Sequence, residues 1–291
     1  MRILVTGGDG MLAQAIRNLC PAYPFEIVFC NKYELDITNL IAVERYFQNS
    51  GFGCIINCAA YTNVEAAESN VEAAYLINET GTKNLAIIAS KYKIPLIHIS
   101  TDAVYDGDKK HAYSESDACN PLSIYSKSKF AGELAIQEPG TNGIIIRTSW
   151  LYSLDKANFV TAILKKARSA GKLSVVFDQL GTPTYTYDLG LAILDIIKKN
   201  FDYINTGMNI YHYSNEGAIS WYDFAVNCCR IAGVNAAITP VFSTEYPTKV
   251  ERPFHAIMSK AKIKNDFNLS IPYWRDSLEK CLADKNKLEN F

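Results

Sequence analysis

Short runs of consecutive apolar residues alternate with segments of helical spacing over the first half of the chain. The apolar runs predict buried strands at 2–6, 25–30, 54–59, 95–100 and 144–147. Between them, apolar residues recur every three or four positions, most clearly over 11–19 and 71–92, which predicts helices. Strands that alternate with helices are typical of a parallel sheet covered on both faces. Because parallel crossovers are right-handed, we expect an α/β fold with a doubly wound, Rossmann-type sheet.

Two further helices are predicted from their boundary residues. Asp36-Ile-Thr38 precedes apolar positions that run from Leu40 to Phe47, so this tripeptide is expected to cap a helix. Asn120 is expected to be the N-cap of the other helix, with Pro121 as its first residue, and Pro139-Gly140 is expected to end it.

The pattern loosens after residue 150, where helices are predicted at 159–170, 188–199 and 220–232 and strands at 173–177 and 210–213. Four prolines interrupt the last fifty-odd residues. We therefore expect a smaller C-terminal substrate-binding domain. The dinucleotide-binding domain would span 1–148 and be completed by part of 186–214, and the substrate-binding cap would consist of 149–185 and 215–291.

Composition narrows the functional classes. The 291 residues include 29 basic and 30 acidic side chains, a balance that argues against a general nucleic-acid or membrane-surface binder. No run reaches the ~18–20 apolar residues of a membrane span, and a glycine turn follows residue 5 where a signal peptide would continue. The 8 cysteines are irregularly spaced and the four histidines are scattered, which favours a reduced, cytoplasmic chain with no metal site. A homodimer stays open.

A glycine-rich turn, TGGDGMLA at 6–13, follows the first strand and begins the first helix. Glycines permit a tight turn and close backbone approach, and the helix N-terminus offers free N–H groups to a pyrophosphate. The second strand ends at Cys30 with no acidic residue, and Asn31 and Lys32 follow it. An acidic residue there would bind the ribose hydroxyl of NAD, so its absence beside a lysine favours the 2′-phosphate of NADPH, with NADH tolerated.

Tyr125 and Lys129 are four residues apart on a predicted helix and therefore share one helix face. A phenol has a pKa of about 10, and a neighbouring ammonium can stabilise its phenolate. Tyr125 could then protonate a carbonyl oxygen as hydride reaches the carbon. A hydroxyl at the end of the fourth strand, from Thr101 or the adjacent Ser100, could hydrogen-bond the same oxygen.

Several segments together resemble the extended short-chain dehydrogenase/reductase family and, within it, the dTDP-4-dehydrorhamnose reductases. These segments are the glycine turn, LDIT at 35–38, INCAAYTNVEAAES at 56–69, HISTDAVYDG at 98–107, NPLSIYSKSKFAGE at 120–133, IRTSWLYS at 146–153, NFV at 158–160, DQLGTPTYTYDLG at 178–190, IYHYSNEGAISWYDFA at 210–225 and YPTKVERP at 246–253. The resemblance extends over nearly the whole chain. It implies an NAD(P)H-dependent reduction of the C4 keto group of a nucleotide-linked 6-deoxyhexose, in the biosynthesis of dTDP-rhamnose and cell-surface polysaccharide.

The resemblance also implies roles for individual residues. Thr101, Tyr125 and Lys129 would form the catalytic set. The cofactor would lie against Gly7, Gly10, Met11, Asn31, Lys32, Asp36, Ile37, Ala59, Ala60, Tyr61, Tyr125 and Lys129. The nucleotide sugar would meet Thr101, Asp102, Ala103, Trp150 and Arg252, with the aromatic face packing on the sugar and the guanidinium on the diphosphate.

Departures from the family pattern keep alternatives open. The usual STDYVFDG is STDAVYDG here, so Ala103 replaces a sugar-facing Tyr, and Ala13 replaces the last glycine of the turn. A reductase of a different nucleotide 4-keto sugar is therefore one alternative, and a non-catalytic regulatory subunit like that of methionine adenosyltransferase is another. An epimerase or dehydratase would share Tyr125 and Lys129, but a dehydratase would need a Glu at position 103.

Overall fold

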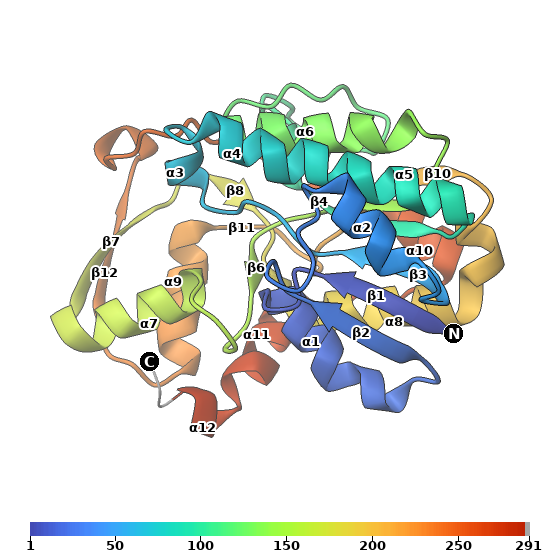
Figure 1. Cartoon of the computed structure of the whole chain (residues 1–291). Helices are drawn as coiled ribbons and strands as arrows, with labels where there is room; N and C mark the ends of the chain where they lie inside the picture. The colour runs from blue at the N-terminus through green and yellow to red at the C-terminus, as the bar shows by residue number, and fades with distance from the viewer. Residues whose placement is uncertain (289–291) are drawn as a thin grey trace.

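A six-stranded parallel sheet forms the centre of the molecule (Figure 1). Its strands are β1 (Arg2–Thr6), β2 (Glu26–Cys30), β3 (Phe52–Asn57), β4 (Leu96–Thr101), β5 (Gly143–Thr148) and β10 (Met208–Tyr213), in the order β10-β5-β4-β3-β1-β2. All neighbouring strands are parallel. The structure is a computed structural model and describes residues 1–288. The predicted doubly wound α/β fold is confirmed.

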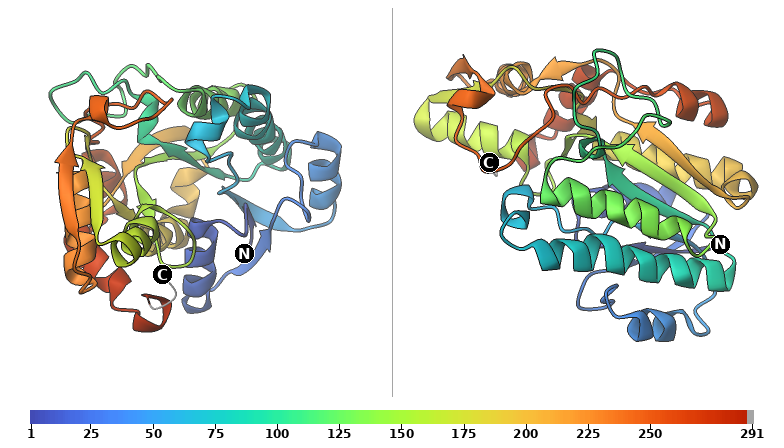
Figure 2. Two further views of the ribbon diagram at one scale, coloured as in Figure 1. Left: turned by 90° about the vertical axis from the view of Figure 1, so that its left-hand side faces the viewer. Right: turned by 90° about the horizontal axis from the view of Figure 1, so that it is seen from above.

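Helices cover both faces of the sheet because the strands are apolar on both sides. In β1, Ile3 and Val5 belong to the core beneath α1 (Met11–Leu19) and α8 (Thr186–Ile204), whereas Leu4 belongs to the opposite core. The opposite face is covered by α2 (Leu40–Phe47), α5 (Thr82–Tyr92) and α6 (Ile124–Gln137), and Figure 2 shows α5 and α6 side by side. The side-chain alternation of each strand thus places half of its residues in each core.

Two predicted helix starts were wrong. Helix α6 begins at Ile124, and its N-cap is Ser123, whose hydroxyl accepts from Ser126 N while Ser126 Oγ accepts from Ser123 N. This reciprocal cap replaces the one expected at Asn120 and Pro121. Helix α2 is capped by Asn39, because the Asp36 side chain instead accepts from Thr38 two residues later. In both cases a polar side chain nearer the apolar run supplies the cap.

The long helix predicted over 71–92 is present but changes its winding. It consists of α4 (Val71–Tyr75), a π-helical turn, η2 (Leu76–Gly81), and α5. Helix α6 crosses this turn at Gly132, where an added Cβ would lie 2.2 Å from the Asn78 carbonyl oxygen. The missing side chain therefore sets how closely α6 approaches its neighbour.

The C-terminal part has a hydrophobic core of its own and lies beyond the carboxyl ends of the strands, on the left in Figure 1. Its helices are α7 (Phe159–Ala170), α9 (Trp221–Ile231), α11 (Trp274–Leu282) and α12 (Lys285–Leu288), and its strands pair as β7 (Lys172–Val176) with β12 (Ala237–Val241), β6 (Leu151–Tyr152) with β9 (Thr184–Tyr185), and β8 (Leu180–Gly181) with β11 (Ile219–Ser220). Helix α10 (Ala261–Phe267) packs beside β10. The exact boundaries of the two domains stay a prediction.

Short helical turns complete the structure: η1 (Cys20–Ala22), α3 (Val64–Ala67), η3 (Asp102–Val104) and η4 (Ser243–Glu245). The eight cysteines are all free thiols. None of the helices within residues 1–288 has the length and apolarity to cross a membrane.

The close approach at Gly132 is testable. In Gly132→Ala, the added methyl would meet backbone rather than a movable side chain, so we expect a loss of about 2 kcal/mol or more in the free energy of unfolding, measured by urea denaturation. Gly53→Ala is the control, because the nearest atom to its added methyl is in the flexible Met1 side chain. Equal stability losses in the two variants would contradict this packing.

Candidate active site

The glycine turn forms a cradle for a phosphate group. Gly7 has a φ of +65°, and a Cβ there would lie 2.7 Å from the Ala59 nitrogen, so only glycine fits. Gly10 is the N-cap of α1 and no side chain caps this helix, which leaves the N–H groups of its first turn available. A backbone cradle beside an uncapped helix N-terminus fits the pyrophosphate of a dinucleotide. Gly7, Gly10 and Met11 lie together at this turn, and their contact with the cofactor stays a prediction.

Two basic side chains lie near the end of β2, one that the sequence indicated and one that it did not. Lys32 is exposed and lies 4.9 Å from the Tyr33 ring centroid, while the Asn31 side chain accepts from Tyr33 N. Arg17, on α1, stacks its guanidinium 4.0 Å from the Phe29 ring of β2. Arg17 therefore approaches this strand end from a different element, and no motif in the sequence connects the two.

The residues expected around the rest of the cofactor differ in exposure. Asp36 is exposed, but the Ile37 side chain is buried beneath Gly81, so Ile37 offers only its backbone to a ligand. Ala59, Ala60 and Tyr61 follow β3 and are half-buried. The Asn78 amide exchanges hydrogen bonds with the Tyr61 backbone N–H and carbonyl, which holds this segment in place.

Three side chains of α6 contact three successive residues at the end of β4. Tyr125 hydrogen-bonds through its side chain with Thr101, and Lys129 Nζ donates to the Ile99 carbonyl at 2.7 Å. Glu133 accepts from Ser100 Oγ at 2.5 Å. The helical spacing of four matches these contacts to one strand end, and this fixes the register of α6 along β4.

These contacts separate the two candidate hydroxyls. Ser100 is buried and its hydroxyl is committed to Glu133, whereas Thr101 lines a cavity together with Tyr125. Thr101 is therefore the hydroxyl that a bound substrate could reach.

Burial dominates the electrostatics of the site. It raises the pKa of Tyr125 to about 12, an effect that the hydrogen bond with Thr101 opposes and the neighbouring Asp102 reinforces. Burial also raises the pKa of Asp102 to about 7 and lowers that of Lys129 to about 8. The expected ammonium–phenol contact is not formed, because Lys129 Nζ is turned to Ile99 O and His98. Tyr125 is thus protonated at neutral pH, as a proton donor must be.

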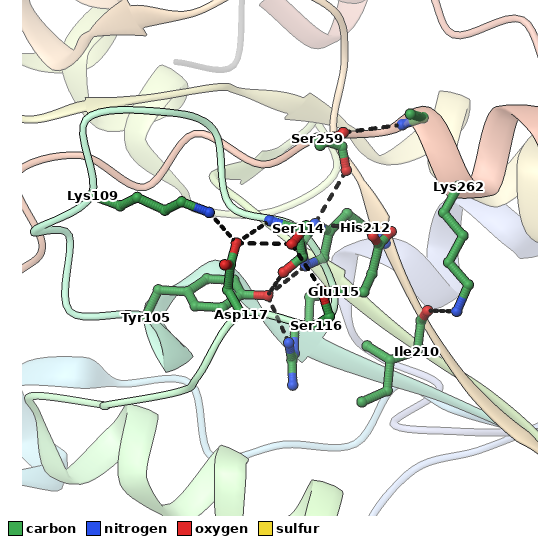
Figure 3. A network of polar contacts seen from close by, with 12 residues as sticks. Tyr105, Lys109, Ser114, Glu115, Ser116, Asp117, Ile210, His212, Ser259 and Lys262 are labelled. Carbon is green, nitrogen blue, oxygen red and sulfur yellow. Dashed lines mark hydrogen bonds and ion pairs between the residues drawn. The ribbon is translucent and has the colours of Figure 1, made fainter.

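A buried ion pair between α6 and β5 helps to hold α6 in register along β4. Arg147 Nη2 donates to Glu133 Oε2 at 2.6 Å and Arg147 Nε donates to Oε1 at 3.0 Å, and both side chains are at most 3% exposed. Arg147 Nη1 donates to the Tyr105 hydroxyl at 2.7 Å. Figure 3 shows this hydroxyl between Ser114 and His212, whose Nε2 lies 2.7 Å away. The network connects β4, β5, α6 and β10 beneath the cavity.

The cavity brings the predicted substrate-binding residues together. Thr101, Asp102, Ala103, Trp150 and Arg252 all line it, from three separate stretches of sequence. It is also lined by residues that the sequence analysis missed as individual site residues, among them Trp221, Val64, Leu122, Gln179, Leu180 and Val250. The Trp150 and Trp221 rings stack at 3.5 Å with 12° between their planes, so the cavity has a platform of two indoles. Nothing in the sequence pairs these distant tryptophans.

Arg252 forms an ion pair with the Glu65 carboxylate. Its Nη2 donates to Glu65 Oε1 at 2.8 Å and its Nη1 donates to Thr248 Oγ1 at 2.8 Å. Glu65 belongs to α3, so this contact ties the 246–253 segment to the first half of the chain beside the cavity that Arg252 lines. The Arg252 side chain is about one-third exposed, which leaves it accessible to a competing anion.

Among residues 1–288, no three His, Cys, Asp or Glu side chains lie close enough to hold a metal ion.

Comparison with known proteins gives the site its context. Residues 1–287 match the family model described as RmlD substrate binding domain. The chain belongs to this family. One curated member, dTDP-4-dehydrorhamnose reductase of Aggregatibacter actinomycetemcomitans, is 34% identical over 97% of this chain and 98% of its own length. A dTDP-4-keto-6-deoxy-D-glucose reductase of Streptomyces niveus is 30% identical over 99% of both chains.

A solved structure extends the family likeness to three dimensions. The crystal structure of dTDP-4-dehydrorhamnose reductase from Bacillus anthracis in complex with NADP superposes with a TM-score of 0.92, at 34% identity, and covers 97% of this chain and 99% of that one. The family resemblance noted in the sequence is confirmed.

The buried ion pair yields a stability prediction. Arg147→Met leaves the Glu133 carboxylate buried and unpaired, so we expect a loss of about 3–5 kcal/mol in the free energy of unfolding. The double variant Glu133→Gln/Arg147→Met should recover part of that loss, because it removes both charges. Lys83→Met, which breaks an exposed pair with Glu138, is the control and should change little. A double variant as unstable as the single one would show that lost packing, not the unpaired charge, causes the effect.

Proposed function

We propose that this protein is an NADPH-dependent reductase of a nucleotide-linked 4-keto-6-deoxyhexose, and that it converts dTDP-4-dehydro-L-rhamnose to dTDP-L-rhamnose. The observation that carries the proposal is a single cavity lined both by a hydroxyl pair, Thr101 and Tyr125, and by the stacked indoles of Trp150 and Trp221. Family membership supports the reaction, and the relative crystallised with NADP supports the cofactor.

The glycine cradle and the first turn of α1 would hold the cofactor pyrophosphate, and Lys32 with Arg17 would meet its 2′-phosphate. When bound, NADPH supplies the hydride. Charge and geometry support both contacts, because backbone N–H groups and guanidinium groups are natural donors to phosphate oxygens.

The chain's own residues orient the keto group and protonate it. Thr101 and Tyr125 hydrogen-bond the C4 carbonyl oxygen and polarise it, and Tyr125 donates its proton as negative charge develops there. Burial keeps this proton on the phenol at neutral pH. Trp150 and Trp221 pack on the sugar ring, and Arg252 binds the diphosphate after it leaves Glu65.

A reductase acting on a different nucleotide 4-keto sugar is the second candidate. Ala103 lines the cavity at the position where the family pattern has a tyrosine, and the Streptomyces niveus relative is named for a different keto sugar. A panel of nucleotide 4-keto sugars, followed by NADPH oxidation, tests both candidates. Turnover of dTDP-4-dehydro-L-rhamnose at the highest kcat/KM supports the first, and no turnover of it rejects the first.

The proton donor can be tested by removing one atom. Tyr125→Phe keeps the ring but removes the hydroxyl, so we expect kcat to fall by at least ~100-fold while NADPH affinity, measured by fluorescence titration, changes little. Tyr92→Phe is the matched control and should retain full activity, because it removes an exposed hydroxyl at the end of α5, before β4 begins. A Tyr125→Phe variant with wild-type kcat would remove Tyr125 from the mechanism. A wild type that binds NADPH and yet reduces no keto sugar would favour the regulatory-subunit alternative.

If Arg252 exchanges Glu65 for the substrate diphosphate, substitutions of these two residues should change KM in opposite directions. Arg252→Met should raise KM for the nucleotide sugar about tenfold or more, because a charged hydrogen bond to the diphosphate is lost. Glu65→Gln should lower the same KM, because the competing carboxylate is gone. Steady-state kinetics at saturating NADPH measure both. If Glu65→Gln instead raises KM as Arg252→Met does, Glu65 positions the arginine rather than competing for it.

A further inference from the structure

A chain of buried polar side chains runs across the sheet from the glycine turn to Lys129. Thr6, Asn57 and His98 are register partners on β1, β3 and β4. Thr6 Oγ1 donates to Asn57 Oδ1 at 2.7 Å, Asn57 Nδ2 lies 3.0 Å from His98 Nδ1, and His98 Nε2 lies 3.3 Å from Lys129 Nζ. His98 is completely buried. The proposed mechanism assigns no role to this histidine.

The orientation of the Asn57 amide follows from its neighbours. The backbone N–H of Ala59 donates to Asn57 Oδ1 at 3.1 Å, and a backbone N–H can only donate. The other end of the amide, Nδ2, therefore points to His98 and donates to its Nδ1.

This orientation determines the tautomer of His98. Burial holds the pKa of His98 well below its usual range, and the Asn57 donor at Nδ1 leaves only one ring nitrogen for a proton, so the imidazole is neutral. Since Nδ1 accepts from Asn57, that proton resides on Nε2. Nε2–H then faces the Lys129 nitrogen. An ammonium there would set two donors against each other, whereas a neutral amine can accept the hydrogen bond.

We propose that His98 is a positioning residue for the reduction, which directs its Nε2–H at the Lys129 amino group and so stabilises the neutral amine form of that side chain. Burial acts in the same direction, and the Glu133 carboxylate, itself paired with Arg147, and the Cys58 thiol act against it. Tyr125 is the other titratable group of the same helix face. Lys129 then exchanges its proton close to neutral pH, where the phenol must be reprotonated after each turnover. That last consequence rests on the proposed function, whereas the tautomer does not.

His212 provides an internal reference for the tautomer. It is also buried and neutral, but its Nδ1 lies 3.1 Å from the Ser259 carbonyl, which can only accept. His212 therefore carries its proton on Nδ1, which leaves its Nε2, 2.7 Å from the Tyr105 hydroxyl, unprotonated. The two buried histidines should be opposite tautomers.

Long-range ¹H–¹⁵N spectra of cofactor-free, ¹⁵N-histidine-labelled protein test the proposal directly, because protonated and unprotonated ring nitrogens have well-separated shifts. The expected result is a protonated Nε2 and an unprotonated Nδ1 for His98, assigned by loss of its signals in His98→Gln, with the reverse for His212. An Nδ1–H tautomer or an imidazolium at His98 would overturn the proposal, whether or not the protein reduces a keto sugar.

The effect on Lys129 is measured by ¹³C NMR titration of lysine-labelled protein and by the pH profile of kcat/KM. In His98→Phe the donor is lost, so the Lys129 pKa and the corresponding limb of the profile should both move up by about one pH unit. His98→Gln should stay near wild type, because its amide can accept from Asn57 and donate to Lys129. His212→Phe is the matched control and should leave the profile in place. Equal shifts in the His98 and His212 variants, or none in His98→Phe, would contradict the role.

Discussion

The register of helix α6 along strand β4 is the constraint on which the rest of the site depends. One turn of helix separates Tyr125 from Lys129 and the next separates Lys129 from Glu133, and each contacts one of three consecutive strand residues. A slide of α6 by one residue would break all three contacts at once. Gly132 sets the depth of the helix and the Glu133–Arg147 pair holds its position from behind. The arrangement therefore aims a hydroxyl pair at the cavity before any substrate arrives, which is the preorganisation that carbonyl reduction needs.

Burial also shifts the pKa values of the ionisable groups in this arrangement. The pKa of Tyr125 is raised to about 12, that of Lys129 is lowered to about 8 and that of Asp102 is raised to about 7, all chiefly because these groups are removed from water. The net charge of the chain is close to zero and gives no indication of these local pKa shifts. One cationic side chain that could meet a small anion, Arg252, lines the cavity and is held there by the Glu65 carboxylate.

The sequence predicted those parts of the molecule that local patterns encode. Strand positions follow from apolar runs, the cofactor turn from its glycines, and the shared face of Tyr125 and Lys129 from a spacing of four. Helix caps were wrongly predicted at Asn120 and Asp36. Several polar residues near each helix start could act as the cap, and only the tertiary fold decides which one does. Trp221 and the Glu65–Arg252 pair were missed because they join segments far apart in the chain, for which no spacing rule exists. The side-chain hydrogen bonds of Lys129 likewise depend on neighbours from other strands.

In the proposed reaction, hydride reaches the C4 carbon of a keto sugar while Tyr125 protonates the oxygen. The decisive measurement is the reaction of the wild-type protein with dTDP-4-dehydro-L-rhamnose and NADPH that carries deuterium at both C4 positions of the nicotinamide, with the product analysed by NMR and mass spectrometry. We expect one deuterium per product, located at C4 of the sugar, and one NADPH oxidised for each sugar reduced. Product without deuterium at C4, or a sugar converted with no net oxidation of NADPH, would contradict it.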